Sequence, residues 1–246
     1  MFNFFADKSN LINGEFFLFG QDFNHIKNVL RFKVGDKFLV SADGKSHLCE
    51  LSRFEEDSAV ALIVQEDYVD TSLKVEMYLF QGIPKSDKLE LIIQKAVELG
   101  VAGIIPLEMK NCIAKIEKSK EKNKLARFQA IAESAAKQSK RNEVPTVYPV
   151  TTVAELTKNI NKLDHLLVPY ENQEGMASTI DALSNIKAGD KVGVVIGPEG
   201  GFSSQEIDAL VGAGAKTISL GKRILRTETA SLTSLSMIML YAEAKL

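Results

Sequence analysis

The chain of 246 residues contains 45% hydrophobic and 25% charged residues and carries a formal net charge of −2. This balance excludes a disordered or low-complexity chain, and the length allows one large domain or two smaller ones. Neither a membrane-spanning helix nor a secretory signal is expected, and Cys49 and Cys112 are too few for a disulfide framework or a zinc site. We therefore expect a cytoplasmic protein without membrane attachment and without a bound metal.

Short strand-like runs fill the chain up to residue 72. They span residues 15–18, 37–41, 47–54 and 58–65. Asp43 and Gly44 lie between two of these runs and fit a type I′ hairpin turn, which needs positive φ at both central positions. One short helix is predicted at 22–30, and the polar residues 67–72 are expected to act as a linker. The pattern favours a small β-barrel.

From residue 73 onward, strands alternate with helices. The segment 84–100 predicts a helix that starts at Asp87, where Glu90 completes a capping-box pattern, and stops at Gly100. Further helices are predicted at 153–160, 203–212 and 229–242, and strands at 75–81, 103–107, 146–148, 166–169, 191–196 and 217–220. Such alternation is typical of an α/β domain with a parallel sheet covered on both faces. A domain boundary is therefore predicted near residue 72.

The segment from Lys110 to Arg141 is strongly basic, although the whole chain is nearly neutral. It contains ten Lys and Arg residues against three Glu residues, which gives a local charge of +7. Two interpretations stay open. The segment can bind nucleic-acid phosphates, or it can be a solvated helix face with Glu–Lys pairs.

A glycine-rich loop follows the apolar strand at 192–196. Its sequence is Gly197-Pro-Glu-Gly-Gly201, and Ser203 with Glu206 predicts a capping box at the next helix. Ligands of open α/β sheets bind beyond the carboxyl ends of strands, and glycine lets the backbone approach them closely. The spacing matches neither a dinucleotide fingerprint nor a P-loop. A ligand loop and a simple tight turn both stay open for this segment alone.

A second loop of the same kind follows the strand at 217–220. It carries Gly221, Arg223, Arg226 and Glu228 ahead of the last helix. Two such loops at strand ends predict one shared ligand site. For Arg226 and Glu228, a surface ion pair near a helix start, or an acid favoured by the helix dipole, also stays open.

The sequences of these two loops resemble motifs of a known family. IGPEGGFSSQEI (196–207) and SLGKRILRTETA (219–230) resemble the two signature motifs of the ribosomal RNA small subunit methyltransferase E family, which belongs to the SPOUT superfamily of knotted methyltransferases. Other similar blocks are KSDKLELIIQKAVELGVAGIIPL (85–107), the turn at 112–115, AKQSKRNEVP (136–145) and HIKNVLRFKVGDKF (25–38), the last in a PUA-like RNA-binding domain. Glu143 departs from the pattern, because a basic residue is expected there.

The resemblance implies a fold and a cofactor. We expect a PUA-like β-barrel over residues 1–72 and a SPOUT methyltransferase domain over 73–246, with a deep trefoil knot at approximately 190–235 and assembly as a homodimer. S-adenosyl-L-methionine would lie in the knot, held mainly by backbone groups. The contacts implied are Leu167, Val168, Pro169, Ile196, Gly197, Pro198, Glu199, Gly200, Gly201, Leu220, Gly221, Ile224, Leu225, Thr229 and Ala230.

The resemblance also implies the reaction, which is methylation of N3 of a uridine in 16S ribosomal RNA, either naked or within the small subunit. The base must be unpaired, and its N3 proton must leave. We expect the positive charge of Arg226, or secondly of Arg223, to favour the N3 anion. Glu228 is expected to accept or orient the proton, and a structural role for it is equally open. Predicted RNA contacts are His25, Arg31, Lys85, Lys115, Lys140, Arg141, Asn142 and Arg223.

Three other functions stay open at this point. One is a SPOUT enzyme that acts on another RNA site, such as a transfer-RNA ribose 2′-hydroxyl. Another is an RNA-binding or ribosome-assembly module without catalysis. The third, a Rossmann-type dehydrogenase, is disfavoured because the glycine loops come late in the chain and lack its spacing.

Overall fold

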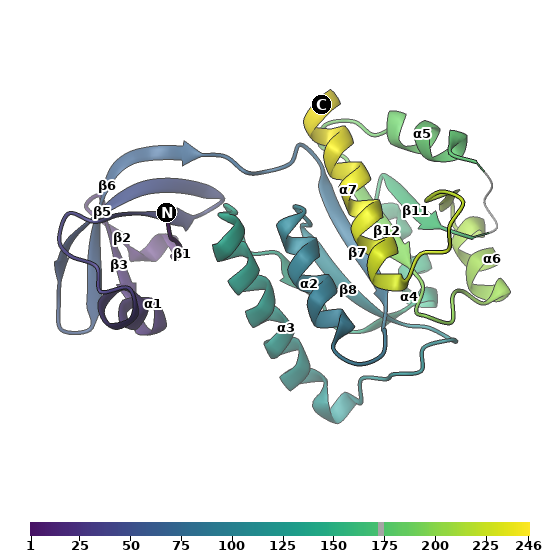
Figure 1. The fold of residues 1–246 in the computed structure, drawn as a ribbon, viewed down its shortest axis with the longest axis horizontal. Coiled ribbons are helices and arrows are strands. Elements are labelled where there is room, and N and C mark those ends of the chain that lie inside the picture. The colour runs from purple at the N-terminus through teal and green to yellow at the C-terminus, as the bar shows by residue number, and fades with distance from the viewer. Residues whose placement is uncertain (172–174) are drawn as a thin grey trace. The chain divides into compact units, whose positions relative to one another are not determined.

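The computed structural model describes residues 1–171 and 175–246. Within them the chain forms two compact units (Figure 1). The first contains Met1–Ser72 together with Ala136–Val144, and the second contains Leu73–Ala135 and Pro145–Leu246. The sequence predicts a division at residue 72 but does not place the short segment 136–144 in the first unit. No helix of the described residues is both long and apolar enough to cross a membrane.

The first unit is built on a six-stranded sheet in the order β1-β4-β5-β6-β3-β2, in which only the β1–β4 pair is parallel. Its elements are β1 (Asn3–Phe5), η1 (Lys8–Asn10), β2 (Leu11–Ile12), β3 (Glu15–Phe19), α1 (Gly20–Asn24), η2 (His25–Val29), β4 (Lys37–Ala42), β5 (Lys45–Phe54) and β6 (Ser58–Val69). Asp43 and Gly44 have φ of 52° and 75° between β4 and β5, so the predicted hairpin turn is confirmed. The strands β1 and β2 are too short to show an alternating pattern, and the sequence prediction lacks them.

The segment 136–144 is fastened to this sheet by Asn142, whose side chain is buried. Its Nδ2 donates to the carbonyls of Gly44 and Val69, both at 3.2 Å. Its Oδ1 accepts from the backbone N–H of Thr71 at 3.1 Å and from the Thr71 hydroxyl at 2.8 Å. The predicted linker 67–72 is therefore partly strand β6 and partly the anchor of this segment, because its backbone polar groups find partners there.

The second unit contains a parallel sheet in the order β10-β8-β7-β12-β11-β13, with β9 also paired to β8. Its strands are β7 (Glu76–Gly82), β8 (Gly103–Glu108), β9 (Thr146–Val147), β10 (Thr151–Thr152), β11 (His165–Pro169), β12 (Lys191–Ile196) and β13 (Lys216–Ile218). Its helices are α2 (Lys88–Glu98), α3 (Lys118–Ser139), which runs into the segment 136–144, α4 (Val153–Lys158), η3 (Ile160–Lys162), α5 (Ala177–Ser184), α6 (Ser204–Gly212) and α7 (Thr227–Lys245).

Helices cover both faces of this sheet, and the predicted parallel α/β architecture is confirmed. Helix α7 packs on β7 and β12 and also against α2, whereas α4 packs against α6 (Figure 1). Successive side chains of a strand point to opposite faces. Phe80 and Val195 accordingly join a core with Leu156 of α4 and Leu210 of α6. Strand β12 is buried from Val192 to Ile196, so the loop after its carboxyl end is where the chain can reach solvent and ligand.

Local signals at the helix ends are mostly, but not always, realised. Ser203 and Glu206 form the predicted capping box of α6, and Gly100 ends α2 with φ of 91°. Asp87 stands at the start of α2 but its side chain makes no capping hydrogen bond, so that detail of the prediction is wrong. Its backbone carbonyl accepts from Glu90 N–H instead. The sequence prediction also lacks helix α5.

Candidate functional site

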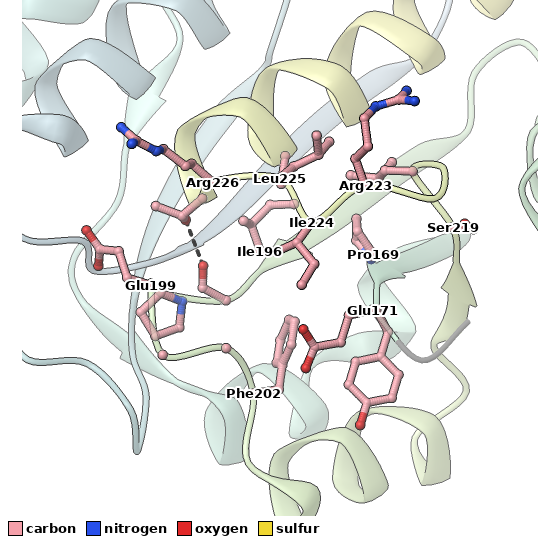
Figure 2. A pocket seen from close by; sticks show the side chains of 18 of the residues that line it. Pro169, Glu171, Ile196, Glu199, Phe202, Ser219, Arg223, Ile224, Leu225 and Arg226 are labelled. Atoms are coloured by element: carbon pink, nitrogen blue, oxygen red, sulfur yellow. Dashed lines mark hydrogen bonds between the residues drawn. The ribbon is translucent and has the colours of Figure 1, made fainter. Parts of the chain in front are cut away.

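The carboxyl ends of β11, β12 and β13 border a cavity of about 530 Å³ (Figure 2). The three strands are neighbours in the sheet and parallel, so their following loops meet at one edge. The cavity is lined by residues 169–171, 196–202 and 219–227, together with Lys88 and Ala230. Its volume lies within the range of small-molecule sites. The two glycine loops therefore share one site, as their repetition in the sequence predicts.

The first loop has a fixed shape that depends on its glycines. Gly201 has φ of 66°, and its N–H donates to the carbonyl of Pro198 at 2.9 Å, which closes a turn. A Cβ on Gly197 would lie 3.3 Å from the Phe202 ring, so a side chain there would crowd the turn. Asn111 supports the loop from outside, since its Nδ2 donates to Gly200 O at 3.0 Å. The backbone of this loop is thus presented to the cavity without covering side chains.

The second loop is held by helix α5. The hydroxyl of the buried Thr179 donates to Ser219 O at 2.7 Å and accepts from Ser219 N–H at 3.0 Å. Gly221 follows with φ of 103°, a conformation that L side chains rarely adopt. Beyond this turn Ile224 is 87% exposed, and its side chain points toward the middle of the cavity (Figure 2). An exposed apolar side chain over a cavity offers a surface that a flat apolar ligand can cover.

A buried chain of hydrogen bonds connects β7 with both loops. The hydroxyl of Thr227 donates to Gly197 O at 2.7 Å and accepts from Gln81 Nε2 at 2.9 Å. The hydroxyl of Ser231 donates to Gln81 Oε1. Gln81 and Thr227 are both buried, so these groups have exchanged water for one another. The network fixes the start of α7 against the first loop.

Charged groups surround one side of the cavity. Glu199 accepts from the backbone N–H of Lys85 and from Lys88 Nζ, and Lys88 also pairs with Glu228. Partial burial raises the pKa of Glu199, but its own backbone N–H, Lys88 and Lys85 N–H outweigh burial and hold the pKa below its usual value. Arg226 is exposed and directed away from the middle of the cavity (Figure 2).

Most of the predicted cofactor residues line the cavity. They are Pro169, Ile196, Gly197, Pro198, Glu199, Gly200, Gly201, Leu220, Gly221, Ile224, Leu225 and Ala230. Leu167 and Val168 do not line it, because both are buried in the sheet within β11. Thr229 does not line it either and is exposed on α7. Among the predicted catalytic residues, Arg226 lines the cavity, whereas Glu228 lies behind Lys88.

The sequence prediction lacks several lining residues. Tyr170 and Glu171 follow β11, and Phe202 ends the first glycine loop. The rings of Tyr170 and Phe202 meet edge to face with centroids 6.4 Å apart. The Glu171 carboxylate points toward the middle of the cavity (Figure 2). An aromatic residue next to a glycine loop is the one signal that the sequence offers for these positions.

The predicted RNA contacts fall in both units. Within the first, His25 packs edge-on against the rings of Phe2 and Phe4, and Arg31 and Lys140 are exposed with φ of 54° and 58°.

Asn142 in the same unit is buried and fully engaged with the sheet. Burial lowers the pKa of the neighbouring Arg141 guanidinium, and Glu143 opposes that effect. Asn142 and Arg141 therefore have a place in the packing of the first unit, in addition to any contact with RNA.

In the second unit Lys115 pairs with Glu108 at 3.1 Å, Lys85 is exposed, and Arg223 lines the cavity. No group of three or more potential metal-ligating side chains occurs in the described part of the chain.

Comparison with known proteins places the chain in a family. Residues 71–239 match the family model described as RNA methyltransferase domain, and residues 19–64 match the RNA methyltransferase PUA domain. The chain is 38% identical over 232 residues to the ribosomal RNA small subunit methyltransferase E of Bacillus subtilis (strain 168), covering 93% of this chain and 91% of that protein. It belongs to the ribosomal RNA small subunit methyltransferase E family. The resemblance seen in the two loop motifs is thereby confirmed.

Two solved structures share the fold. A ribosomal RNA small subunit methyltransferase E from Neisseria gonorrhoeae, bound to S-adenosyl methionine, superposes with a TM-score of 0.82 at 32% identity, over 97% of this chain and 96% of that one. A methyltransferase from Legionella pneumophila in complex with the same cofactor superposes with a TM-score of 0.83 at 28% identity, over 96% of each chain.

Proposed function

We propose that the protein transfers the methyl group of S-adenosylmethionine to N3 of a uridine in 16S ribosomal RNA. The observation that carries this proposal is the cavity at the ends of β11, β12 and β13, lined by both loops that define the family. Two structurally similar proteins were solved with this cofactor. A methyltransferase with a ribosomal substrate works in the cytoplasm, and no metal is needed for the transfer.

The cavity fits S-adenosylmethionine in size and in chemistry. The glycine backbone of the first loop and the side chains of Phe202, Ile224 and Leu225 offer peptide hydrogen-bonding groups beside apolar surface, which a purine nucleoside requires. The loops 196–201 and 220–225 would hold the cofactor. When bound, it supplies an activated methyl group, so the protein's task is alignment of the acceptor base.

We include the trefoil knot and the homodimer in this proposal. Strand β11 lies between β12 and β13, yet the chain after β13 returns through the second loop to α7, which packs on β7 and β12. There Thr227 bonds to Gly197 of the first loop. This return path supports a threaded chain at 190–235. The exposed apolar side chains of Ile180, Ile224 and Leu240 support a second copy as partner.

Arg226 is proposed to stabilise the N3 anion of the uracil. It stands at the N-terminal cap of α7 and lines the cavity, and its exposed guanidinium points away from the middle, where the cofactor would lie, so it is available to a base that approaches from the rim. Arg226→Ala should reduce methyl transfer at least about 100-fold, the effect of removing one preorganised charge, and leave cofactor affinity within about threefold. Near-normal turnover would exclude Arg226 from the reaction.

The first unit is proposed to bind the RNA, with Lys140, Arg31 and His25 as contacts. Lys140 is the cleanest test, because it is exposed whereas Arg141 is partly buried. Lys140→Glu should weaken RNA binding and reduce the slope of log K against log salt by about 1. An unchanged slope would show that Lys140 lies in solvent in the complex.

One experiment separates this function from the alternatives. Small-subunit RNA, assembled small subunits and transfer RNA are each incubated with protein and labelled cofactor, and the modified nucleoside is identified. N3-methyluridine in small-subunit RNA supports the proposal. A 2′-O-methylated nucleoside would identify a different SPOUT activity. Absence of cofactor binding at millimolar concentration would identify a non-catalytic RNA-binding protein.

A further inference from the structure

Lys88, the first residue of α2, is the one cation that contacts acidic groups of both cavity loops within the described chain. Its Nζ lies 3.1 Å from Glu199 Oε1 in the first loop and 3.3 Å from Glu228 Oε2, which follows the second loop. We propose that Lys88 is a positioning residue that sets the affinity for S-adenosylmethionine by holding the two loops together. This inference rests on the proposed function and adds a determinant of cofactor binding.

The surroundings of the three groups explain why a single cation matters. The side chains of Lys88, Glu199 and Glu228 are 33%, 26% and 19% exposed, so solvent screens them only partly. Glu228 Oε2 is inaccessible to solvent and, among the described residues, accepts no hydrogen bond. The ammonium of Lys88 is the charge that compensates it. Without that charge, two carboxylates on one side of the cavity would repel each other across the loops.

Lys88 adds a second connection between the first loop and the start of α7, next to the buried network of Gln81, Thr227 and Ser231. Thr227 ties the start of α7 to Gly197 beneath the loops, in a region without formal charge. Lys88 ties Glu228, one residue further along α7, to Glu199 at the cavity surface, where Lys88 itself is a lining residue. Two connections at different depths fix both the distance between the loops and their rotation. The cavity therefore keeps its width before the cofactor arrives.

The same helix provides a matched control. Lys95 pairs with Glu98 at 2.8 Å, and their side chains are exposed to a similar degree as those of Lys88 and Glu199. This pair lies within α2 and does not line the cavity. Lys95→Met removes one lysine charge and one ion pair from α2, as Lys88→Met does. It does not remove any contact with the cavity loops.

The test measures cofactor binding by calorimetry in the full-length protein. Lys88→Met should raise the Kd for S-adenosylmethionine about tenfold, since a charge-assisted contact is lost, without changing the number of sites per chain. Lys88→Arg should restore the Kd to within about threefold, because a guanidinium can reach both carboxylates. Lys95→Met should bind like the wild type. Glu228→Gln added to Lys88→Met should recover part of the affinity, because the uncompensated carboxylate becomes neutral.

Several outcomes would overturn the inference. A Kd of Lys88→Met within twofold of the wild type would do so. A lower number of sites with an unchanged Kd would show that Lys88 serves only folding, and a further loss in the double variant would show that it does not act through Glu228. If Lys88→Met fails to fold, an unrecovered Kd in Lys88→Arg overturns the inference. Failure of the wild type to bind the cofactor at all would instead refute the proposed function.

Discussion

Replacement of Thr227 by valine tests the buried connection between the two cavity loops. Valine keeps the shape of the side chain but removes the hydrogen bonds to Gly197 O and from Gln81 Nε2. Each is worth about 1 kcal/mol net, and a buried carbonyl left without a partner costs about 1–3 kcal/mol. We expect the free energy of unfolding to fall by about 2–3 kcal/mol. For a chain of this length the melting temperature should drop by about 4–12 °C.

The assay follows thermal unfolding by circular dichroism at a helical wavelength, because α2, α6, α7 and most of α3 belong to the second unit. The control is Thr157→Val. Among the described residues, the Thr157 hydroxyl bonds only within its own helix turn, to Ala154 O at 3.1 Å, so its loss should change stability by less than about 0.5 kcal/mol. Titration of the same variants with the cofactor should show a higher Kd for Thr227→Val alone, because Gly197 O loses its hydrogen bond to the Thr227 hydroxyl.

A melting temperature of Thr227→Val indistinguishable from that of the wild type would refute this reasoning. It would mean that water or a shifted backbone satisfies Gly197 O at no cost. Equal loss of stability in both variants would show that valine disfavours the helices generally, through its stiff side chain.

Three further changes have defined outcomes. Asn142→Ala leaves three backbone groups of the first unit without partners and should destabilise that unit by about 2–3 kcal/mol, seen as faster hydrogen exchange in β4 to β6. Glu199→Gln should destabilise the protein above pH 4.5, because the lowered pKa of Glu199 keeps the wild-type carboxylate charged there. The difference in stability between the wild type and the variant should vanish as the pH falls through that lowered pKa. A difference that persists at low pH would contradict this explanation. Glu171→Gln should reduce the preference for S-adenosylmethionine over its neutral thioether product about fivefold, because a carboxylate that faces the cavity would favour the positively charged sulfonium by about 1 kcal/mol. Equal weakening for both ligands would assign Glu171 to the nucleoside instead.

The sequence predicts the parts of the site that local patterns determine. Strand β12 occupies residues 191–196 as predicted, because a continuous apolar run bounded by a glycine turn has few other conformations. The capping box of Ser203 and Glu206 needs only two residues three positions apart. The convergence of the loops follows from parallel strands that end at one edge.

The remaining features depend on contacts between distant positions. Gln81 and Thr227 bond across 146 positions, and Lys88 reaches Glu199 across 111. A single polar residue in a strand or at a helix start carries no local sign of such a partner. Leu167 and Val168 illustrate the reverse case, since membership in the strand beneath the cavity places their side chains in the core instead of at its surface.

The assignment of Ala136–Val144 to the first unit has a consequence for the newly made chain. A ribosome releases Ser72 long before Val144, which lies 72 positions later. At about 5–20 residues per second, the N-terminal sheet waits roughly 4–14 s for Asn142 and its four hydrogen bonds. During that interval the carbonyls of Gly44 and Val69 lack the hydrogen bonds that Asn142 later donates. The N-terminal unit therefore reaches its final stability only after helix α3 of the catalytic unit has been synthesised.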